Sequence, residues 1–333
     1  MRAPAFWWKK NPGFFALCLW PVSFVYGMIA SRRLHEPGAR ATAPVICVGN
    51  FVMGGAGKTP TAIALARLLK VRGETPVFLT RGYGGALSSP TPLVVRLEHH
   101  YARDVGDEAL LLANVAPTVV CIDRVAGALA AVDAGASVIV MDDGLQNPTL
   151  VKDLSFAVVD GGSGIGNGLT FPAGPLRAPM TAQIPLVSMA VLVGDGEPGN
   201  RAAARLSGKA IRIFRAKLAP RAAIADCLRG RKVIAFAGIG RPEKFFVTLE
   251  ETGAQIVARH AFDDHHMFSS QELRGLVDEA RAADALLVTT EKDFVRLPAG
   301  VNVMALPVEL VFDRQDNVDQ LLTSELKRLR ASR

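Results

Sequence analysis

Residues 45–69, with the sequence VICVGNFVMGGAGKTPTAIALARLL, decide the expected fold. The β-branched apolar run at 45–48 predicts a buried strand, and the apolar residues that follow Thr59 recur at helical spacing. Between the strand and the helix lies a glycine-rich turn, which comprises Gly54, Gly55, Ala56, Gly57, Lys58 and Thr59. This order of strand, glycine loop, Lys-Thr and helix is typical of a loop that binds nucleotide phosphates.

Each residue type in this loop has a physical role. Glycines let backbone N–H groups turn towards a polyphosphate, and the N-terminus of the following helix favours negative charge. Lys58 would bring a positive charge to the β- and γ-phosphates, and the Thr59 hydroxyl would hold Mg²⁺. The chain is therefore expected to bind ATP or a related triphosphate. An ordinary glycine-rich turn is the alternative, because Val52 stands where the full motif has its first glycine.

The composition narrows the class of protein. A chain of 333 residues, half of them hydrophobic, suits about two domains with a large core. The net charge of +7 is concentrated in residues 1–40, which hold six basic side chains and one acid. The nearly neutral remainder argues against a partner nucleic acid, which would need a basic surface. The four cysteines lack the spacing of a zinc site or a disulfide framework, as expected in the cytoplasm.

An uncharged segment of 21 residues lies between Lys10 and Arg32. As a helix it would be about 30 Å long, which is borderline for crossing a bilayer. Trp7, Trp8 and Trp20, together with the flanking basic residues, are typical of side chains that anchor a helix on anionic lipid. We expect residues 1–35 to form a membrane-associated helix. A secretory signal peptide and a buried core helix are the alternatives.

Short apolar runs alternate with helical patterns along the rest of the chain, which predicts an α/β fold with a parallel sheet covered by helices on both faces. Expected strands lie at 45–48, 76–79, 119–122, 138–141 and 156–159, with helices at 58–72, 107–114 and 124–133. A Gly/Pro-rich stretch at 161–179 precedes a second alternating block. We therefore expect a P-loop core over residues 36–205 and a smaller α/β domain over residues 206–333.

Two pairs of acidic residues are candidates for chemistry. Asp142 and Asp143 end the apolar run at 138–141, where parallel strands present their ligands, and resemble the Walker B element that holds Mg²⁺. A plain Asp-Gly turn is the alternative. Asp107 and Glu108 open a predicted helix, where acids also serve as caps and dipole partners.

A cluster of acids and imidazoles follows much later in the chain. Asp263 and Asp264 precede His265 and His266 on a predicted loop, where a carboxylate could orient an imidazole for proton transfer. A solvated surface cluster is the alternative. Which of the two histidines would act stays open.

In their shared order, these motifs resemble the tetraacyldisaccharide 4′-kinase family, the lipid A 4′-kinases of Gram-negative bacteria. The similarity covers nearly the whole chain. After the N-terminal apolar helix it runs through residues 49–50, 54–60, 80–84, 105–108, 141–146, 166–168, 172–177, 237–242, 264–265 and 289–293.

The resemblance implies a kinase that uses ATP to phosphorylate the 4′-hydroxyl of a tetraacyldisaccharide 1-phosphate, a tetraacylated glucosamine lipid, at the cytoplasmic face of the bacterial inner membrane. It implies that Asp107 is the base, paired with His265, and that Glu108, Asp142 and Asp143 surround Mg²⁺. Arg177 is expected near the phosphates or the substrate, although Ala178 stands where the family pattern has an acid. A membrane-associated ATPase switch with a GGxGKT loop is the alternative function.

Overall fold

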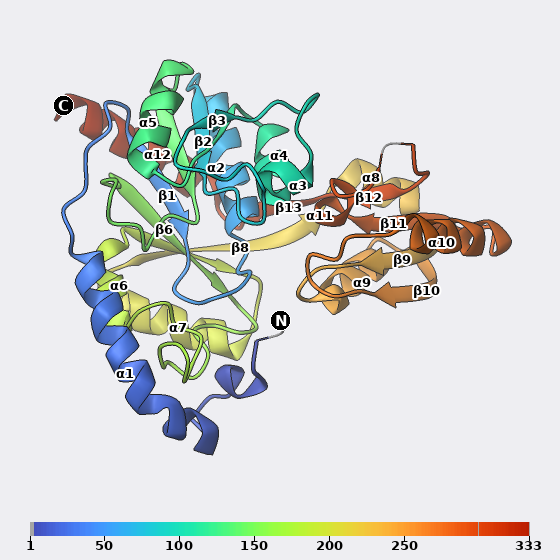
Figure 1. The fold of residues 1–333 in the computed structure, drawn as a ribbon, viewed down its shortest axis with the longest axis horizontal. Helices are drawn as coiled ribbons and strands as arrows, with labels where there is room; N and C mark the ends of the chain where they lie inside the picture. The colour runs from blue at the N-terminus through green and yellow to red at the C-terminus, as the bar shows by residue number, and fades with distance from the viewer. Residues whose placement is uncertain (1–2, 299, 333) are drawn as a thin grey trace.

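The computed structural model describes residues 3–298 and 300–332, which form two sheets and a long helix that lies along one side (Figure 1). Within the described residues the larger sheet has nine strands in the order β13-β8-β7-β6-β1-β5-β2-β4-β3. Its neighbouring strands are parallel except at the two edges, where β13 and β3 run antiparallel. The expected α/β fold with a parallel sheet is confirmed.

The strands of the large sheet are β1 (Val45–Gly49), β2 (Pro76–Thr80), β3 (Leu93–Val94), β4 (Thr118–Val120), β5 (Val138–Asp142), β6 (Leu154–Asp160), β7 (Met189–Val193), β8 (Arg212–Pro220) and β13 (Val308–Phe312). The five strands predicted from apolar runs correspond to β1, β2, β4, β5 and β6. The sequence did not predict β3, β7, β8 or β13.

Helices cover both faces of this sheet because its central strands are mostly apolar and are buried in every position. In β1, Val45 and Cys47 pack into one core while Ile46 and Val48 pack into the core on the opposite face. Burial of each such side chain stabilises the fold by about 1.5–3 kcal/mol. One face carries α2 (Lys58–Val71), α4 (Asp107–Ala113) and α12 (Gln315–Ala331), and the other carries α5 (Arg124–Asp133), α6 (Met180–Gln183) and α7 (Glu197–Ser207).

The smaller sheet is parallel and has the strand order β10-β9-β11-β12. Its strands are β9 (Lys232–Ala237), β10 (Gln255–Ala261), β11 (Leu286–Thr290) and β12 (Met304–Leu306). One face packs against α8 (Ala222–Leu228) and α9 (Pro242–Glu251), and the other against α10 (Ser270–Ala282). The short helices α3 (Ala102–Val105), α11 (Glu291–Phe294) and η2 (Ile184–Leu186) complete the connections.

Two strands that follow residue 206, the expected start of the smaller domain, belong to the large sheet. β8 pairs with β7 in the large sheet, and the chain returns to that sheet on β13, which pairs with β8 from Val308–Pro220 to Phe312–Ala216. The C-terminal helix α12 also packs there, because Val318 and Leu322 fill the core under α2. We propose that the second part of the molecule spans residues 221–307.

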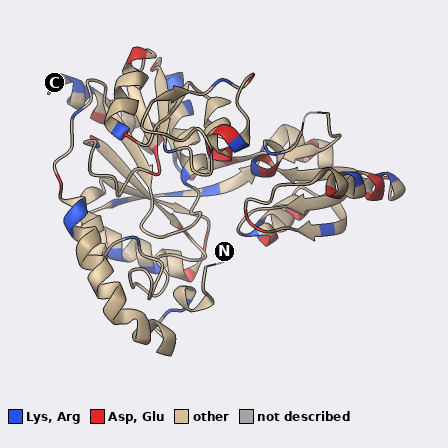
Figure 2. Cartoon of the chain, in the orientation of Figure 1, with Lys and Arg blue, Asp and Glu red and all other residues tan. Residues whose placement is uncertain are grey.

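The N-terminal segment consists of η1 (Ala5–Trp8) and α1 (Phe14–Leu34). Along α1 the ribbon carries almost no charged residue apart from its C-terminal end (Figure 2). One narrow side packs on the protein, where the Ser23 hydroxyl donates to the carbonyl oxygen of Thr170 at 2.7 Å. The other side exposes large apolar residues, namely Phe14, Phe15, Leu17, Trp20, Val22, Phe24, Val25, Met28 and Ile29.

Among the described residues, α1 is one helix that is long and apolar enough to cross a membrane, although a signal sequence would meet the same criteria. Only 17% of its most apolar window is buried, whereas a core helix would be mostly covered. The short helix η1 is also fixed to the body, because the Trp7 indole N–H donates to the carbonyl oxygen of Pro172 at 2.9 Å. The helix therefore belongs to the fold while leaving an apolar surface uncovered.

Candidate active site

The glycine loop lies between β1 and α2, at the carboxyl ends of the central strands. Gly54 and Gly57 have φ values of +106° and +89°, a region that glycine adopts without the strain of a side chain. Lys58 follows at the start of α2, and its ammonium group donates to the carbonyl oxygen of Gly54 at 3.3 Å. The ammonium also lies 3.7 Å from Asp143 Oδ2. The strand, the glycine loop and the helix expected from the sequence are thus all present, as β1, residues 50–57 and α2.

The aspartates at the end of β5 meet this loop because β5 is the neighbour of β1, with Asp142 opposite Val48. The Thr59 hydroxyl donates to Asp142 Oδ2 at 2.9 Å. Asp143 is held from the other side by Arg177, whose guanidinium places one nitrogen 3.0 Å from each carboxylate oxygen. The predicted site residues therefore form two adjacent groups of contacts: Thr59 with Asp142, and Lys58 and Arg177 with Asp143.

The charges around the two aspartates differ. Burial raises the pKa of Asp142 to about 7, and the negative charges of Glu108 and Asp143 act in the same direction. Burial also opposes ionisation of Asp143, but Lys58 and Arg177 outweigh it and hold the pKa of that carboxyl below its usual range. Asp142 Oδ1 is buried and has no hydrogen-bond partner among the described residues. A positive charge beside Asp142 would therefore be stabilised.

The residues present fit a Mg²⁺ ion that is bound partly by phosphate. No group of three or more His, Cys, Asp or Glu side chains is placed to hold a metal ion within the described residues. Mg²⁺ at phosphate sites takes only one or two carboxylates and completes its shell with water and phosphate oxygens. Asp142 and Thr59 offer such a set, whereas Glu108 is engaged by the Lys292 ammonium at 2.8 Å.

Asp107 and His265 lie together although 158 residues separate them in the sequence. Asp107 begins α4, which packs on the large sheet, and His265 follows β10 of the smaller sheet. The imidazole Nδ1 is 3.5 Å from Asp107 Oδ2, a distance that becomes an ion pair when the imidazole is protonated. The Asp107 side chain is 4% exposed and that of His265 is 43% exposed. The buried acid therefore faces an imidazole that solvent or a ligand can reach.

The two neighbouring histidines have different surroundings. His266 stacks on the Phe262 ring with 4.8 Å between centroids, and its Nε2 lies 3.1 Å from Glu272 Oε1. It faces the core of the second part and not Asp107. The geometry therefore distinguishes His265 from His266, which the sequence could not do.

Arg296 is a site residue that the sequence did not indicate. Its side chain is only 3% exposed and donates to Asp107 Oδ2, to Asp293 Oδ1 at 3.0 Å and to the carbonyl oxygen of Gly238 at 3.0 Å. Its Nη2 also lies 3.2 Å from His265 Nδ1. The motif at 289–293 ends three residues before it, but nothing in the sequence pairs an arginine at 296 with an acid at 107.

These contacts set the ionisation of the pair. Burial opposes ionisation of Asp107, but His265, Lys292 and Arg296 together keep the pKa of this acid below its usual range. In return, Asp107 raises the pKa of His265 above its ordinary value, against the opposing effect of partial burial. Asp107 is therefore charged at neutral pH, and His265 is poised to take up a proton.

A second set of contacts joins the two parts of the molecule. Asp160, at the end of β6, accepts from Arg241 Nη1 at 3.0 Å and from the Lys244 ammonium at 2.6 Å. Arg241 also lies over the Trp8 ring, 5.9 Å from its centre. We refer to Asp160, Arg241 and Lys244 as the clasp. It fixes the start of α9 against the end of β6.

The parallel sheet, the glycine loop and the paired aspartates define a nucleotide-binding protein of the P-loop class. A family model described as "Tetraacyldisaccharide-1-P 4′-kinase" matches residues 15–327. The chain belongs to this family, and the resemblance seen in the sequence is confirmed.

Individual relatives agree with the family match. A tetraacyldisaccharide 4′-kinase of Methylobacterium sp. (strain 4-46) is 55% identical over 316 residues, which are 95% of each chain. One from Methylorubrum extorquens is 52% identical over 98% of this chain and all of the relative. The solved structure of LpxK from Aquifex aeolicus in complex with ATP is similar with a TM-score of 0.75 and 25% identity, over 94% of this chain and 100% of that one. These matches leave the ATPase-switch alternative without support.

Proposed function

We propose that this chain transfers the γ-phosphoryl group of ATP to the 4′-hydroxyl of a tetraacylated glucosamine disaccharide 1-phosphate, a step in lipid A synthesis. Family membership and the ATP complex of the Aquifex relative support the reaction and the phosphoryl donor. The observation that carries the proposal is the contact of Asp107 with His265. Glu108, the neighbour of Asp107, also acts electrostatically on the loop side of the site. Burial is the main cause of the raised pKa of Asp142, and the negative charge of Glu108 adds to it.

In this proposal the loop binds the triphosphate and the lysine neutralises its charge. Phosphoryl transfer depends mainly on positioning and on electrostatic stabilisation of the transferred group. Lys58 would leave Gly54 and Asp143 to contact the β- and γ-phosphates. Mg²⁺, when held by Thr59 and Asp142, would neutralise the charge that develops on these phosphates.

Asp107 and His265 would together remove the proton from the acceptor hydroxyl. A sugar hydroxyl does not ionise at neutral pH, so its attack is accelerated when a base takes the proton in the transition state. Asp107 is buried and charged, and it would stabilise the imidazolium that forms on His265. Arg296 would keep the carboxylate in place, because it holds Asp107 from the side away from solvent.

The uncovered side of α1 supports a place on the membrane, where a lipid with four acyl chains would be found. Apolar burial and the charge of Lys9 and Lys10 would hold the N-terminal segment on anionic lipid. We place the body of the protein at the cytoplasmic face of the inner membrane, since ATP is available there.

Transfer of radiolabelled phosphate from ATP to a lipid A precursor in detergent micelles tests the proposed reaction. We expect label at the 4′-position of the disaccharide, and a loss of about 2–4 kcal/mol of transition-state stabilisation in Lys58→Ala. ATP hydrolysis without a labelled lipid, or near-normal kcat in folded Lys58→Ala, would contradict the proposal.

A further inference from the structure

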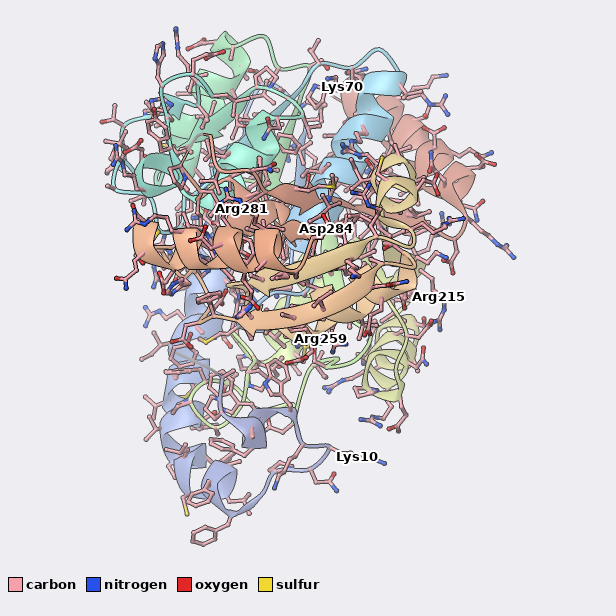
Figure 3. The ribbon with its side chains drawn as sticks, turned by 90° about the vertical axis from the view of Figure 1, so that its right-hand side faces the viewer. Lys10, Lys70, Arg215, Arg259, Arg281 and Asp284 are labelled. Carbon is pink, nitrogen blue, oxygen red and sulfur yellow. The ribbon has the colours of Figure 1, made fainter. Side chains whose placement is uncertain are left out.

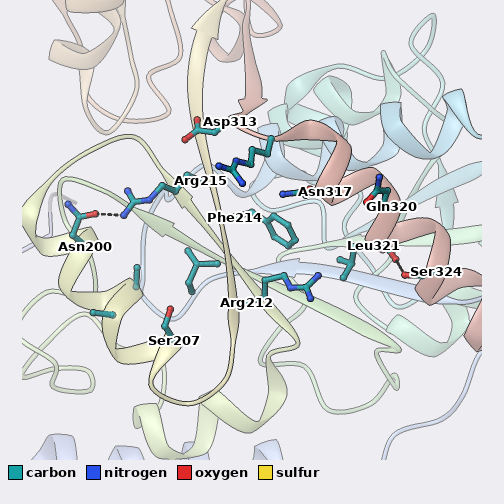
Figure 4. A pocket seen from close by; sticks show the side chains of 14 residues that line it. Asn200, Ser207, Arg212, Phe214, Arg215, Asp313, Asn317, Gln320, Leu321 and Ser324 are labelled. Atoms are coloured by element: carbon teal, nitrogen blue, oxygen red, sulfur yellow. Dashed lines mark hydrogen bonds between the residues drawn. The ribbon is translucent and has the colours of Figure 1, made fainter.

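A large cavity lies outside the candidate active site, between α7, the first half of β8 and α12 (Figure 4). Its volume is about 1120 Å³. Its lining mixes apolar side chains, such as Phe214 and Leu321, with three arginines, namely Arg212, Arg215 and Arg314, and with Asp313 as its acidic member. None of the lining residues belongs to the motifs that carry the family resemblance, so the proposed kinase reaction does not use this cavity.

The floor of this cavity is a free strand edge. β13 pairs with β8 only over Ala216–Pro220, and the last contact is the Asp313 N–H, which donates to the carbonyl oxygen of Arg215 at 3.0 Å. Earlier in β8, the described residues pair only with β7 on the other side. Backbone groups of alternate residues point the same way in a strand. The N–H and C=O groups of Ile213 therefore point into the cavity.

The arginines lie on both sides of this edge. Arg215 extends towards α7, where it donates to Asn200 Oδ1 at 3.0 Å, while Arg212 lies with Phe214 and Leu321 on the side of α12 (Figure 4). Within the described residues, neither Arg212 nor Arg314 has a carboxylate within ion-pair distance. The edge thus combines the unpaired backbone groups of Ile213 with an arginine on each face of the sheet, Arg212 on one and Arg215 on the other.

We propose that this edge binds an extended acidic segment of a partner protein, which adds to β8 as a further strand. Addition of a strand to a free edge gives affinity through backbone hydrogen bonds, and alternate side chains then give specificity. Successive residues of the added segment would point to opposite faces of the sheet. Acidic side chains would meet Arg212 on one face and Arg215 on the other.

Other occupants fit less well. A single small anion would need converging guanidinium groups, whereas Arg212 and Arg215 belong to opposite faces of the sheet. Pairing of two copies through β8 would bring cationic strands together, and like charges opposite one another destabilise a sheet. Charged residues alone can also protect a free edge from aggregation. That role does not require the walled space between α7 and α12.

The proposal can be tested by fluorescence anisotropy on the full-length protein in detergent. The probe is a short labelled peptide in which two glutamates alternate with two valines. We expect saturable binding that weakens as salt is raised, and about a fivefold loss of affinity in Arg212→Ala and in Arg215→Ala. Arg281→Ala is the matched control, because Arg281 is an exposed arginine on α10, far from Arg215 (Figure 3). Its affinity should be unchanged.

A second peptide separates strand addition from simple charge attraction. It has the same acidic residues with proline in place of each valine, so it lacks the backbone N–H donors of those positions, and we expect it to bind at least tenfold more weakly. Equal binding of both peptides, or an equal loss in Arg281→Ala, would overturn the proposal. Displacement of the peptide by inorganic phosphate at similar concentration would indicate a small-anion site instead. A dimer in sedimentation that dissociates in Arg212→Ala would indicate that a second copy occupies the edge.

Discussion

Asp107 begins helix α4 and His265 lies on the loop after β10, so each side chain can be replaced without changing the element that carries the other. We expect Asp107→Ala and His265→Ala each to lower kcat strongly while the affinity for ATP stays nearly intact. If the two residues act as a unit, the double variant should be little worse than the worse single variant, because such effects are not additive. Single-turnover phosphorylation of the lipid, together with ATP binding, measures both quantities.

His266→Ala is the matched control for this double-mutant cycle. His266 packs on Phe262 and Glu272 and does not face Asp107. Its loss should lower the melting temperature and leave kcat almost unchanged. Multiplicative losses of kcat in the Asp107/His265 double variant would show that the two residues act independently.

The ionisation of His265 predicts a pH dependence. Asp107 raises the pKa of this imidazole, so the neutral form that accepts a proton is present only above a value higher than the ordinary ~6.5. The acidic limb of kcat against pH should therefore lie above ~6.5. NMR titration of the His265 ring checks the assignment. Asp107→Asn should lower the measured pKa, and an unchanged titration would exclude Asp107 as the cause.

A site residue could be predicted from the sequence only where neighbouring residues form a recognisable pattern. Gly57, Lys58 and Thr59 are adjacent in the chain, so a short pattern was enough to place them on one loop. Arg296 was missed because its partner Asp107 is 189 residues away, and no local pattern encodes that pairing. His265 could be separated from His266 only when the direction of each ring was known.

At the scale of elements, the exposed side of α1 predicts how the protein meets lipid. We expect the triple variant Phe14→Ser/Phe15→Ser/Ile29→Ser to lose most vesicle binding, since each side chain is more than half exposed. The fold should be kept, because Ser23 and Trp7 still fix the segment to the body. Flotation with anionic vesicles and a thermal melt measure the two effects.

Val71→Ser is the control for general hydrophobicity. Val71 is 83% exposed but lies at the end of α2, away from the N-terminal segment. This variant should float like the parent protein. Undiminished flotation of the triple variant would show that the apolar side of α1 does not bind lipid.

The elements themselves differed in how far the sequence revealed them. β1 is buried in every position, so its apolar run was sufficient. β8 has the sequence RIFRAKLAP and mixes exposed basic residues with buried Phe214 and Ala216, so it shows no apolar run. Its pairing with β7 and β13 is decided by residues elsewhere in the chain. The expected boundary at residue 206 therefore differs from the division at 221 that we propose, because β8 and β13 gave no strand signal in the sequence.

At the scale of the whole molecule, the clasp predicts how firmly the two parts are held together. The charges of Lys244 and Arg241 outweigh the burial of Asp160 and hold the pKa of that carboxyl at about 2. Because this pKa is depressed on folding, the stabilisation is complete above the unfolded value of ~4 and declines as the pH falls towards 2. Asp160→Asn should therefore lower stability by about 1 kcal/mol at neutral pH, since both partners are partly exposed.

Urea unfolding of the parent protein and of Asp160→Asn at several pH values tests this prediction. The difference between the two proteins should shrink as the pH is lowered below ~4. A difference that is constant with pH would mean that the clasp contributes packing and not charge. Faster hydrogen exchange in α9 of the variant would locate the loosened contact.

The antiparallel pairing of β8 with β13 makes the second part an insertion whose two ends are neighbours, since Pro220 lies opposite Val308. Excision of residues 221–307 would leave β8 and β13 to be closed by a short hairpin turn, and the remainder would keep every strand of the large sheet. The excised piece would carry away His265 but not Asp107. If this piece were supplied as a separate chain, it would have to reach about millimolar concentration to match the effective concentration of His265 at Asp107 that its two covalent attachments provide. The double connection thus acts as a tether that maintains a high local concentration of the imidazole at its acid.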